Sequence, residues 1–419
     1  MGGQTSAPGN TRPPAPGPPP GRGRATTLLI ALRFGYAYNW FDIGPALPRI
    51  GATFGVGPGD WGLLVASFLI GAGATQVPAG FLARRHGERP VALAGAALLA
   101  VAALASAFAP SFALLLAARL AAGVGAGLFF SPAIGWVGRL FGPGERGVPV
   151  GTFSSAFSAG AAGGVFGSAL LVPMLGWSGS LAAGALGLGV VTAVAVLAVP
   201  REPAPASPPA PPGESVLSST AWRGRGVLAI GLAFVGFEGA TFATGQFVVP
   251  WGEVVRLWPA WLAGAVGTAF VLPSVLGGPV GGVVSERSMR HRTQLAGVTI
   301  AGAGALAALP IAGVAAALVV GSVFSFAYGF AYAVMYVIPH YWPQLPARDV
   351  PLAIGVFNAI QLSGGALVSV AFGLLVADRS YAFAWEVVAA VQVATLVALF
   401  ALPPTAAGRP PVEAAPARP

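Results

Sequence analysis

Twelve long apolar stretches alternate with short polar loops along the chain, and each stretch is close to the length that a helix needs to cross a bilayer. Pro and Gly interrupt several of the stretches, which helices in membranes tolerate. The pattern predicts an all-α membrane protein with twelve transmembrane helices. We expect these spans at residues 26–47, 61–83, 90–109, 112–136, 149–172, 178–199, 226–249, 259–284, 294–311, 313–338, 350–376 and 381–402.

Three polar, Pro-rich segments divide the chain. Residues 1–25 lack the apolar core of a signal peptide, and we expect them to form a disordered tail. A similar segment at 200–225 separates an N-terminal six-helix bundle (26–199) from a C-terminal six-helix bundle (226–402). The remaining residues, 403–419, are predicted to be a second disordered tail.

The two halves repeat each other in sequence. The segment GFLARRHGER begins at Gly80 and its counterpart GVVSERSMR begins at Gly282, 202 residues later. Gly151 and Gly355 are separated by a similar 204 residues. Paired six-helix repeats are typical of secondary transporters, in which the solute site lies near the midplane between the halves. We therefore expect two pseudo-symmetric bundles and a small-molecule substrate.

Composition excludes several other classes of protein. The chain is 55% hydrophobic and 8% charged, so neither a soluble globular enzyme nor a disordered protein is expected. It contains no Cys, which excludes thiol nucleophiles and thiolate metal sites. No nucleotide-binding loop or nucleophile motif occurs, so we expect no enzyme activity and no cofactor. His86, His291 and His340 lack metal-ligand spacing, and we expect them to be solvated in loops, with no metal site.

The distribution of Arg predicts the orientation in the membrane. Every basic residue is Arg, and the net charge is +9. If both termini are cytoplasmic, seventeen Arg residues lie inside, and only Arg49, Arg256 and Arg379 lie outside. This asymmetry explains the positive charge without a nucleic-acid partner. The Ala, Gly, Pro and Arg bias favours a bacterial source, and we therefore expect a multi-pass, monomeric protein in the bacterial cytoplasmic (inner) membrane, surrounded by lipid.

Two motifs give the chain a resemblance to the major facilitator superfamily. The loop after the second span resembles the family's G-x-L-a-D-r-x-G-r-k motif, although Arg84 stands at the acidic position; the second copy has Glu286 there. The sequence Arg119-x-x-x-Gly123-x-Gly125 is similar to a motif of the fourth span. The resemblance implies alternating access between two bundles, with spans 1, 4, 7 and 10 lining the cavity. It also implies a cytoplasmic gate formed by Gly80, Arg85, Gly87, Arg89, Gly282, Glu286 and Arg287.

Ionisable residues inside spans are functional candidates, because their burial in a membrane is costly. Glu238 is central in its span and, offset by 204 residues, corresponds to a position next to Arg33. We expect Glu238 to carry a proton, because hydration and a nearby charge control its protonation; the alternative is a static ion pair with Arg33. Asp42 and Arg119 lie at similar depth on neighbouring spans, where they form either a structural pair or a second site for a proton or an anion.

Polar residues in the cavity-lining spans are candidates for binding substrate. Tyr328, Tyr332 and Tyr336 recur at every fourth residue and so share one helix face. Their hydroxyls need partners at membrane depth, which favours a cavity over the lipid. The complete set of expected substrate-binding residues is Arg33, Tyr36, Asn39, Arg119, Gln246, Tyr328, Tyr332, Asn358 and Gln361.

These patterns together predict a secondary active transporter that moves a small solute by alternating access and couples it to protons through Glu238 and Asp42. Two alternatives stay open. An organic-anion uniporter or exchanger would use the buried Arg residues. A non-transporting membrane sensor would usually carry a long soluble domain, and the sequence has none.

Overall fold

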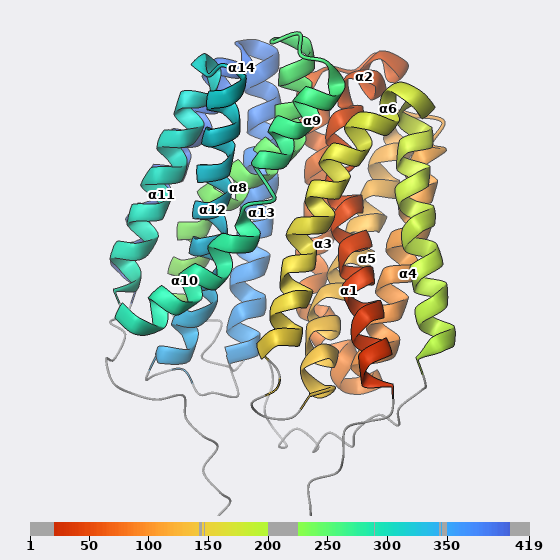
Figure 1. The fold of residues 1–419 in the computed structure, drawn as a ribbon, viewed down its shortest axis with the longest axis vertical. Coiled ribbons are helices and arrows are strands. Elements are labelled where there is room, and N and C mark those ends of the chain that lie inside the picture. The colour runs from red at the N-terminus through yellow and green to blue at the C-terminus, as the bar shows by residue number, and fades with distance from the viewer. Residues whose placement is uncertain are drawn as a thin grey trace, which may run out of the picture.

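The computed structural model describes residues 21–141, 145, 147–199, 225–288, 290–342, 345 and 350–402. All regular structure in these ranges is helical (Figure 1). The all-α prediction is therefore confirmed. The predicted C-terminal tail, residues 1–20 of the predicted N-terminal tail and most of the predicted 200–225 linker lie outside the described residues. The disordered tail expected to reach residue 25 is shorter, because α1 begins at Arg22.

The first group of helices ends with α6 and occupies one side of the molecule (Figure 1). Its elements are α1 (Arg22–Phe41), the short 3₁₀ helix η1 (Gly44–Ala46), α2 (Leu47–Phe54), α3 (Pro58–His86), α4 (Glu88–Ala107), α5 (Phe112–Arg139) and α6 (Gly147–Ala198).

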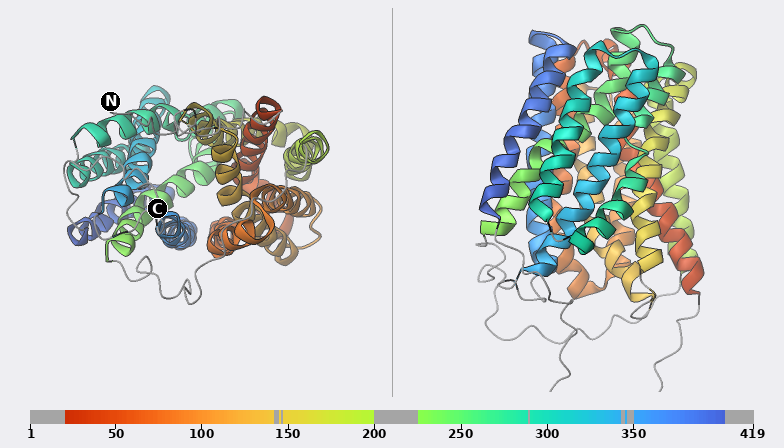
Figure 2. Two further views of the ribbon diagram at one scale, coloured as in Figure 1. Left: turned by 90° about the horizontal axis from the view of Figure 1, so that it is seen from below. Right: turned by 60° about the vertical axis from the view of Figure 1, so that its left-hand side comes forward.

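The second group begins with α8 and lies beside the first, as the view along the helices shows (Figure 2). Its elements are α8 (Arg225–Val254), α9 (Ala260–Ala269), α10 (Ser274–Ser288), α11 (His291–Ala308), η3 (Leu309–Ile311), α12 (Val314–Val337), η4 (Ile338–Tyr341), α13 (Val350–Asp378), α14 (Tyr381–Ala394) and η6 (Thr395–Ala401).

The predicted spans coincide with helical segments. Not every predicted span is a separate helix that is long and apolar enough to cross a membrane. Ten segments of the described chain meet these criteria. The spans expected at 149–172 and 178–199 are the two arms of α6, which meet at Gly176, where φ is 71°. The first predicted span corresponds to α1, which has 20 residues, ends at Phe41 and is not among the ten. The span expected at 259–284 consists of α9 and α10, with Pro273 in the break between them.

The spacing between the two groups changes along α3 and α13. Gly62, Gly73 and Gly80 lie on one face of α3, because 11 and 18 residues are close to whole numbers of helical turns. A Cβ at Gly62 would lie 2.6 Å from the carbonyl oxygen of Ser369, and one at Gly73 would lie 3.4 Å from Leu362. At Gly80 nothing lies within 4 Å of that position. Close by, a Cβ at Gly355 of α13 would lie 3.7 Å from Val77 of α3. The two groups therefore pack closely at the Gly62 end and more loosely toward Gly80, which is the more open end.

The open end of the molecule is also the Arg-rich end. Arg84 and Arg85 lie in the last turn of α3, Arg139 is the last residue of α5, and Arg287 lies in the last turn of α10. The described helices that adjoin the tails and the linker, α1, α6 and α8, also begin or end there (Figure 1). At the opposite end, η1 packs so closely on α8 that a Cβ at Gly44 would lie 2.8 Å from the carbonyl oxygen of Gln246.

Candidate functional site

Glu238 lies in the middle of α8 and is only 4% exposed. Its Oε2 atom accepts a hydrogen bond of 2.8 Å from the hydroxyl of Tyr328 on α12. Gly365 on α13 brings backbone close to the same side chain, since a Cβ there would lie 3.4 Å from Cγ of Glu238. Within the described part of the chain, no Arg or His lies within ion-pair distance of this carboxyl group.

The predicted Tyr face on α12 extends into a hydrogen-bonded row. Tyr336 donates to Oδ1 of Asn358 at 2.6 Å, and its hydroxyl lies 2.8 Å from that of Tyr332. Because the proton of Tyr336 is used for Asn358, Tyr332 must be the donor to Tyr336. Gln361 donates to the same Asn358 oxygen at 2.8 Å, while its own Oε1 atom is buried without a partner. The structure thus brings together Tyr332, Tyr336, Asn358 and Gln361 from two helices.

Arg33 occupies an aromatic cage inside the first group of helices. The guanidinium carbon lies 4.6 Å from the ring centre of Tyr36, 4.4 Å from Phe130, 5.4 Å from Phe153 and 4.6 Å from Phe157. These rings come from α1, α5 and α6. Arg33 is 6% exposed, and its Nε and Nη1 atoms are buried without a hydrogen-bond partner.

Arg33 and Glu238 face a shared region but do not form an ion pair. Tyr332 lies within electrostatic range of both residues, and so does Tyr36 from the opposite group of helices. Nevertheless, no ion pair between Arg33 and Glu238 occurs, although both are described. The static ion pair that the sequence left open is therefore absent, because the cage holds Arg33 on its own side.

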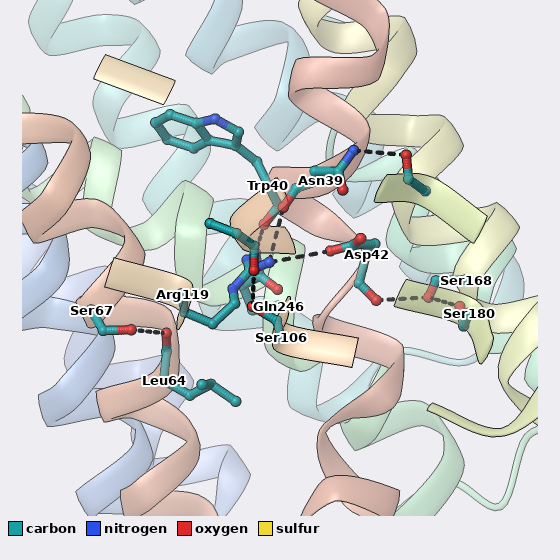
Figure 3. Close-up of polar contacts among 12 residues, drawn as sticks. Asn39, Trp40, Asp42, Leu64, Ser67, Ser106, Arg119, Ser168, Ser180 and Gln246 are labelled. Carbon is teal, nitrogen blue, oxygen red and sulfur yellow. Dashed lines mark hydrogen bonds and ion pairs between the residues drawn. The ribbon is translucent and has the colours of Figure 1, made fainter. Parts of the chain in front are cut away.

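Asp42 and Arg119 form a buried pair, which is one of the two arrangements that the sequence left open (Figure 3). Nη1 of Arg119 lies 3.6 Å from Oδ1 of Asp42 and donates to the carbonyl oxygen of Asn39 at 3.1 Å. Both side chains are 1% exposed. Ser168 on α6 donates to the backbone oxygen of Asp42 at 2.7 Å, and its hydroxyl also bonds to that of Ser180. The pair lies where α1 ends and η1 begins.

Asn39 and Gln246 make contacts between helices that the sequence did not predict. Asn39 donates to the carbonyl oxygens of Gly35 and Gly184, which connects α1 to α6. Gln246 donates to the backbone oxygen of Trp40 at 2.7 Å and so connects α8 to α1 (Figure 3). Below this bond, the rings of Trp40 and Phe41 stack on Phe242. We therefore assign Gln246 to the contact between the two groups in this conformation.

The expected gate residues lie at the open end. Arg89 donates to the carbonyl oxygens of Val196 and Val199, and thereby holds the start of α4 against the end of α6. Glu286 and Arg287 are exposed, and neither takes part in an ion pair within the described residues. An ion pair of 2.7 Å between Glu88 and Arg139, which no sequence pattern indicated, lies at the same end.

One expectation about the histidines is wrong. His291 begins α11 but is 3% exposed, and neither ring nitrogen has a hydrogen-bond partner. Its ring packs 6.1 Å from that of Tyr341, so tertiary packing covers a residue that the sequence placed in solvent. His86 is exposed as expected. The described residues contain no group of three or more His, Cys, Asp or Glu side chains that could hold a metal ion.

The aromatic cage was also missed, although a signal for part of it exists. Phe153 and Phe157 are four residues apart and therefore share one face of α6. Phe130 comes from α5, and only the packing of α5 against α1 and α6 places it beside Arg33. The buried aromatic side chains of a membrane protein are too numerous for spacing alone to identify such a cage.

Comparisons with known proteins agree with this architecture. The family model described as Major Facilitator Superfamily matches residues 29–369. A D-xylose–proton symporter is similar in structure, with a TM-score of 0.71, 16% sequence identity, and coverage of 90% of this chain and 97% of the other. A comparison with curated proteins found no match.

Two further solved structures are similar in fold to the same degree. A bacterial homologue of the human lysosomal transporter Spinster, in an inward-facing and occupied conformation, has a TM-score of 0.71 and 16% identity, with coverage of 92% and 96%. The xylose transporter XylE from E. coli, in a partially occluded inward-open conformation, has the same TM-score and identity, with coverage of 93% and 99%.

Proposed function

Because the chain belongs to the major facilitator superfamily, whose members are transporters rather than enzymes, we propose that it is a proton-coupled secondary transporter of a small solute. The solute crosses the bacterial cytoplasmic membrane by alternating access between the two groups of helices. One observation carries the coupling: Glu238 is buried in the middle of α8, with a Tyr hydroxyl as its partner and no cation within ion-pair distance among the described residues.

The divergence of α3 from α13 supports alternating access. The contact at Gly62 closes the end that is poor in Arg, and the packing is looser toward Gly80 at the Arg-rich end. Loops rich in Arg face the cytoplasm under the positive-inside rule. The conformation is then inward-facing, with both termini cytoplasmic. The exposed, unpaired state of Glu286 agrees with a cytoplasmic gate that is open.

The surroundings of Glu238 support a carboxyl group that gains and loses a proton. A buried carboxylate without a cation is costly, so its protonation state depends on hydration and on hydrogen bonds. The titratable groups within electrostatic range of Glu238 are Tyr328, Tyr332 and Tyr336 on α12 and Tyr36 on α1. Opening the site to either side of the membrane changes its hydration, and so exchanges the proton with that side.

Asp42 is a second candidate for the coupling carboxyl group. It differs from Glu238 because Arg119 lies beside it and favours the ionised state. Loss of the Asp42 charge would leave a buried Arg unpaired, which is strongly unfavourable. We therefore rank Glu238 first and treat the Asp42–Arg119 pair mainly as a structural element of the outer end.

An organic-anion uniporter or exchanger is the second candidate function. It is favoured by Arg33, which is buried and has no anionic partner within the described chain. Arg119 does not favour the anion transporter, because it already pairs with Asp42 and donates to the backbone of Asn39. The two functions differ in one respect, since a uniporter does not accumulate its solute in response to a pH gradient.

Uptake by proteoliposomes tests the proposal. The purified full-length protein is reconstituted and offered a panel of labelled solutes, with and without an imposed pH gradient. Wild type should accumulate at least one solute when the gradient is present. Glu238→Gln should abolish accumulation and spare exchange of the solute between equal concentrations. The matched control is Glu386→Gln, because Glu386 is an exposed carboxyl group on α14.

The result separates the alternatives. Gradient-independent equilibration by wild type would favour the uniporter. Accumulation by Glu238→Gln with an unchanged pH dependence would make Glu238 a structural residue. In that case Asp42→Asn becomes the variant that decides whether the Asp42–Arg119 pair carries the proton.

A further inference from the structure

Arg33 is the most unusual charged residue in the described membrane-spanning part of the chain. Buried charges in proteins are normally paired, because an unpaired ion loses its hydration without compensation. Arg119 follows this rule through Asp42. Among the described residues Arg33 has no anionic partner, although a guanidinium group cannot lose its proton in a protein and the Tyr36 hydroxyl beside it is neutral. An anion bound beside Arg33 would compensate its charge.

The cage compensates for only part of this cost. Four aromatic rings lie within 4.4–5.4 Å of the guanidinium carbon, and cation–π attraction contributes a fraction of what an anion would supply. The four rings surround the guanidinium group and restrict its movement. Its N–H donors point outward in the plane, and those of Nε and Nη1 have no partner. A planar anion at the edge that Nη2 shares with either of these atoms would accept two hydrogen bonds, one of them from an unpartnered donor.

We propose that Arg33 binds the carboxylate of the transported solute, and that this solute is a small organic monocarboxylate. A carboxylate matches the edge of a guanidinium group with two parallel hydrogen bonds, which a point anion such as chloride cannot form. The aromatic rings around Arg33 also provide apolar surface for an organic body. The inference rests on the proposed transport function and identifies the class of solute.

The second group of helices offers the opposite wall of this site. Tyr332 lies within electrostatic range of Arg33, and it begins the hydrogen-bonded row that continues through Tyr336 to Asn358. At the end of this row, Oε1 of Gln361 is buried without a donor. A solute held between Arg33 and Tyr332 would touch both groups of helices, so its binding would favour their closure around it.

Charge counting connects the anion to the proton. When empty, the site contains the positive Arg33 and the negative Glu238, which sum to zero. When the site holds both a monocarboxylate and a proton on Glu238, the sum is again zero. With the anion alone the sum is −1, and with the proton alone it is +1. An occluded, water-poor site disfavours a net charge. The empty site and the fully loaded site, which are both neutral, should therefore change fastest between the inward-facing and outward-facing conformations. The transporter then carries one anion with one proton, without net charge movement.

Binding to the purified full-length protein tests the proposal without any need for transport. Isothermal titration at constant ionic strength uses sodium lactate and sodium benzoate as probes, lactamide and benzamide as their neutral counterparts, and sodium chloride and phosphate as inorganic anions. We expect at least one carboxylate to bind, its amide not to bind, and the inorganic anions not to compete.

Two substitutions at Arg33 give the residue-level test. Arg33→Gln should weaken carboxylate binding at least tenfold, which corresponds to about 1.4 kcal/mol. Arg33→Lys keeps the charge but loses the paired hydrogen bonds, and it should bind with intermediate affinity. The matched control is Arg22→Gln, because Arg22 forms an exposed ion pair with Glu145 and should have no effect.

Several results would overturn the proposal. The first is that neither carboxylate binds to wild type. The second is that acid and amide bind equally well. The third is that wild type, Arg33→Lys and Arg33→Gln all bind the carboxylate with the same affinity. Binding of inorganic anions alone would also contradict it. The wild-type comparison of acid with amide stands even if Arg33→Gln fails to fold.

The test is independent of the test of the proposed function. If a neutral solute accumulates under a pH gradient and no carboxylate binds, proton coupling stands and the anion site is wrong. If carboxylates bind through Arg33 and Glu238→Gln still accumulates them, the anion site stands and the role of Glu238 is wrong. Carboxylate-dependent currents in a wild-type proteoliposome would contradict the one-to-one charge balance.

Discussion

The hydroxyl of Tyr328 donates a hydrogen bond of 2.8 Å to the carboxyl group of Glu238, and this bond connects α12 to α8. Among the polar groups around Glu238, Tyr328 is the one with direct contact. A donor to a carboxylate stabilises its ionised form, so Tyr328 helps to set the pH at which Glu238 exchanges its proton. The bond also crosses between two helices that would line the solute path.

Tyr328→Phe should shift the pH dependence of transport. Loss of the donor destabilises the ionised carboxyl group, so the proton is released only at higher pH and the profile moves to the alkaline side. A hydrogen bond to a charged group contributes about 1.5–3 kcal/mol, which corresponds to a shift of one to two pH units. Initial uptake rates between pH 5 and 9 measure the shift.

The chain offers a matched control for that experiment. Tyr381 on α14 has a buried hydroxyl without a hydrogen-bond partner, so Tyr381→Phe removes the same atom without removing a bond. Its pH profile should match that of wild type. An unchanged profile in Tyr328→Phe would show that the Tyr328 bond has no influence on the coupling group.

Asp42→Asn should destabilise the folded protein, because it leaves Arg119 buried at 1% exposure without a counter-charge. Breaking a buried pair in this way costs about 3–5 kcal/mol. The double variant Asp42→Asn, Arg119→Gln removes both charges and should recover much of the loss. Thermal unfolding in detergent measures all three proteins. A double variant that is less stable than Asp42→Asn would contradict this account of the pair.

Gly62→Ala should move the conformational equilibrium away from the conformation described here. A Cβ at Gly62 would lie 2.6 Å from the backbone oxygen of Ser369, and backbone cannot easily move aside. Overpacking of this kind costs about 1–3 kcal/mol, and the cost applies only while the outer end is closed. Spin labels on Cys introduced at Arg85 and Arg287 would report the distance across the cytoplasmic end, which should shorten.

Gly80→Ala is the control for this prediction. Gly80 lies on the same face of α3, but nothing lies within 4 Å of a Cβ there in the present conformation. The substitution should leave the inward-facing state unstrained. Identical distance distributions for Gly62→Ala and wild type would mean that the contact between α3 and α13 does not control the outer end.

Single-Cys labelling tests the orientation in the membrane, and the absence of native Cys makes it direct. Leu257 is 82% exposed between α8 and α9, and Arg85 is exposed at the opposite end. An impermeant maleimide added to intact cells should label Leu257→Cys and not Arg85→Cys. After permeabilisation both should react. The reverse pattern would invert the topology and the inward-facing interpretation.

The sequence by itself determined the features that depend on position along the chain. The apolar stretches predicted the helices because a bilayer of fixed thickness requires spans of defined length and apolarity. The motif around Gly80 and its repeat at Gly282 identified the family. The Tyr face on α12 could also be predicted, since a spacing of four residues returns to the same side of a helix whatever surrounds it.

Tertiary structure decided which polar groups meet, because contacts between helices depend on rotation and approach that sequence spacing does not contain. Arg33 and Glu238 occupy nearly corresponding positions in the two halves, yet they form no ion pair, and Arg33 lies in an aromatic cage within the first group of helices. Gln246 bonds to the backbone of Trp40 because α1 ends at Phe41 and leaves that carbonyl oxygen available. His291 is covered although its sequence neighbours are polar, since packing against Tyr341 depends on where α11 and η4 lie in three dimensions.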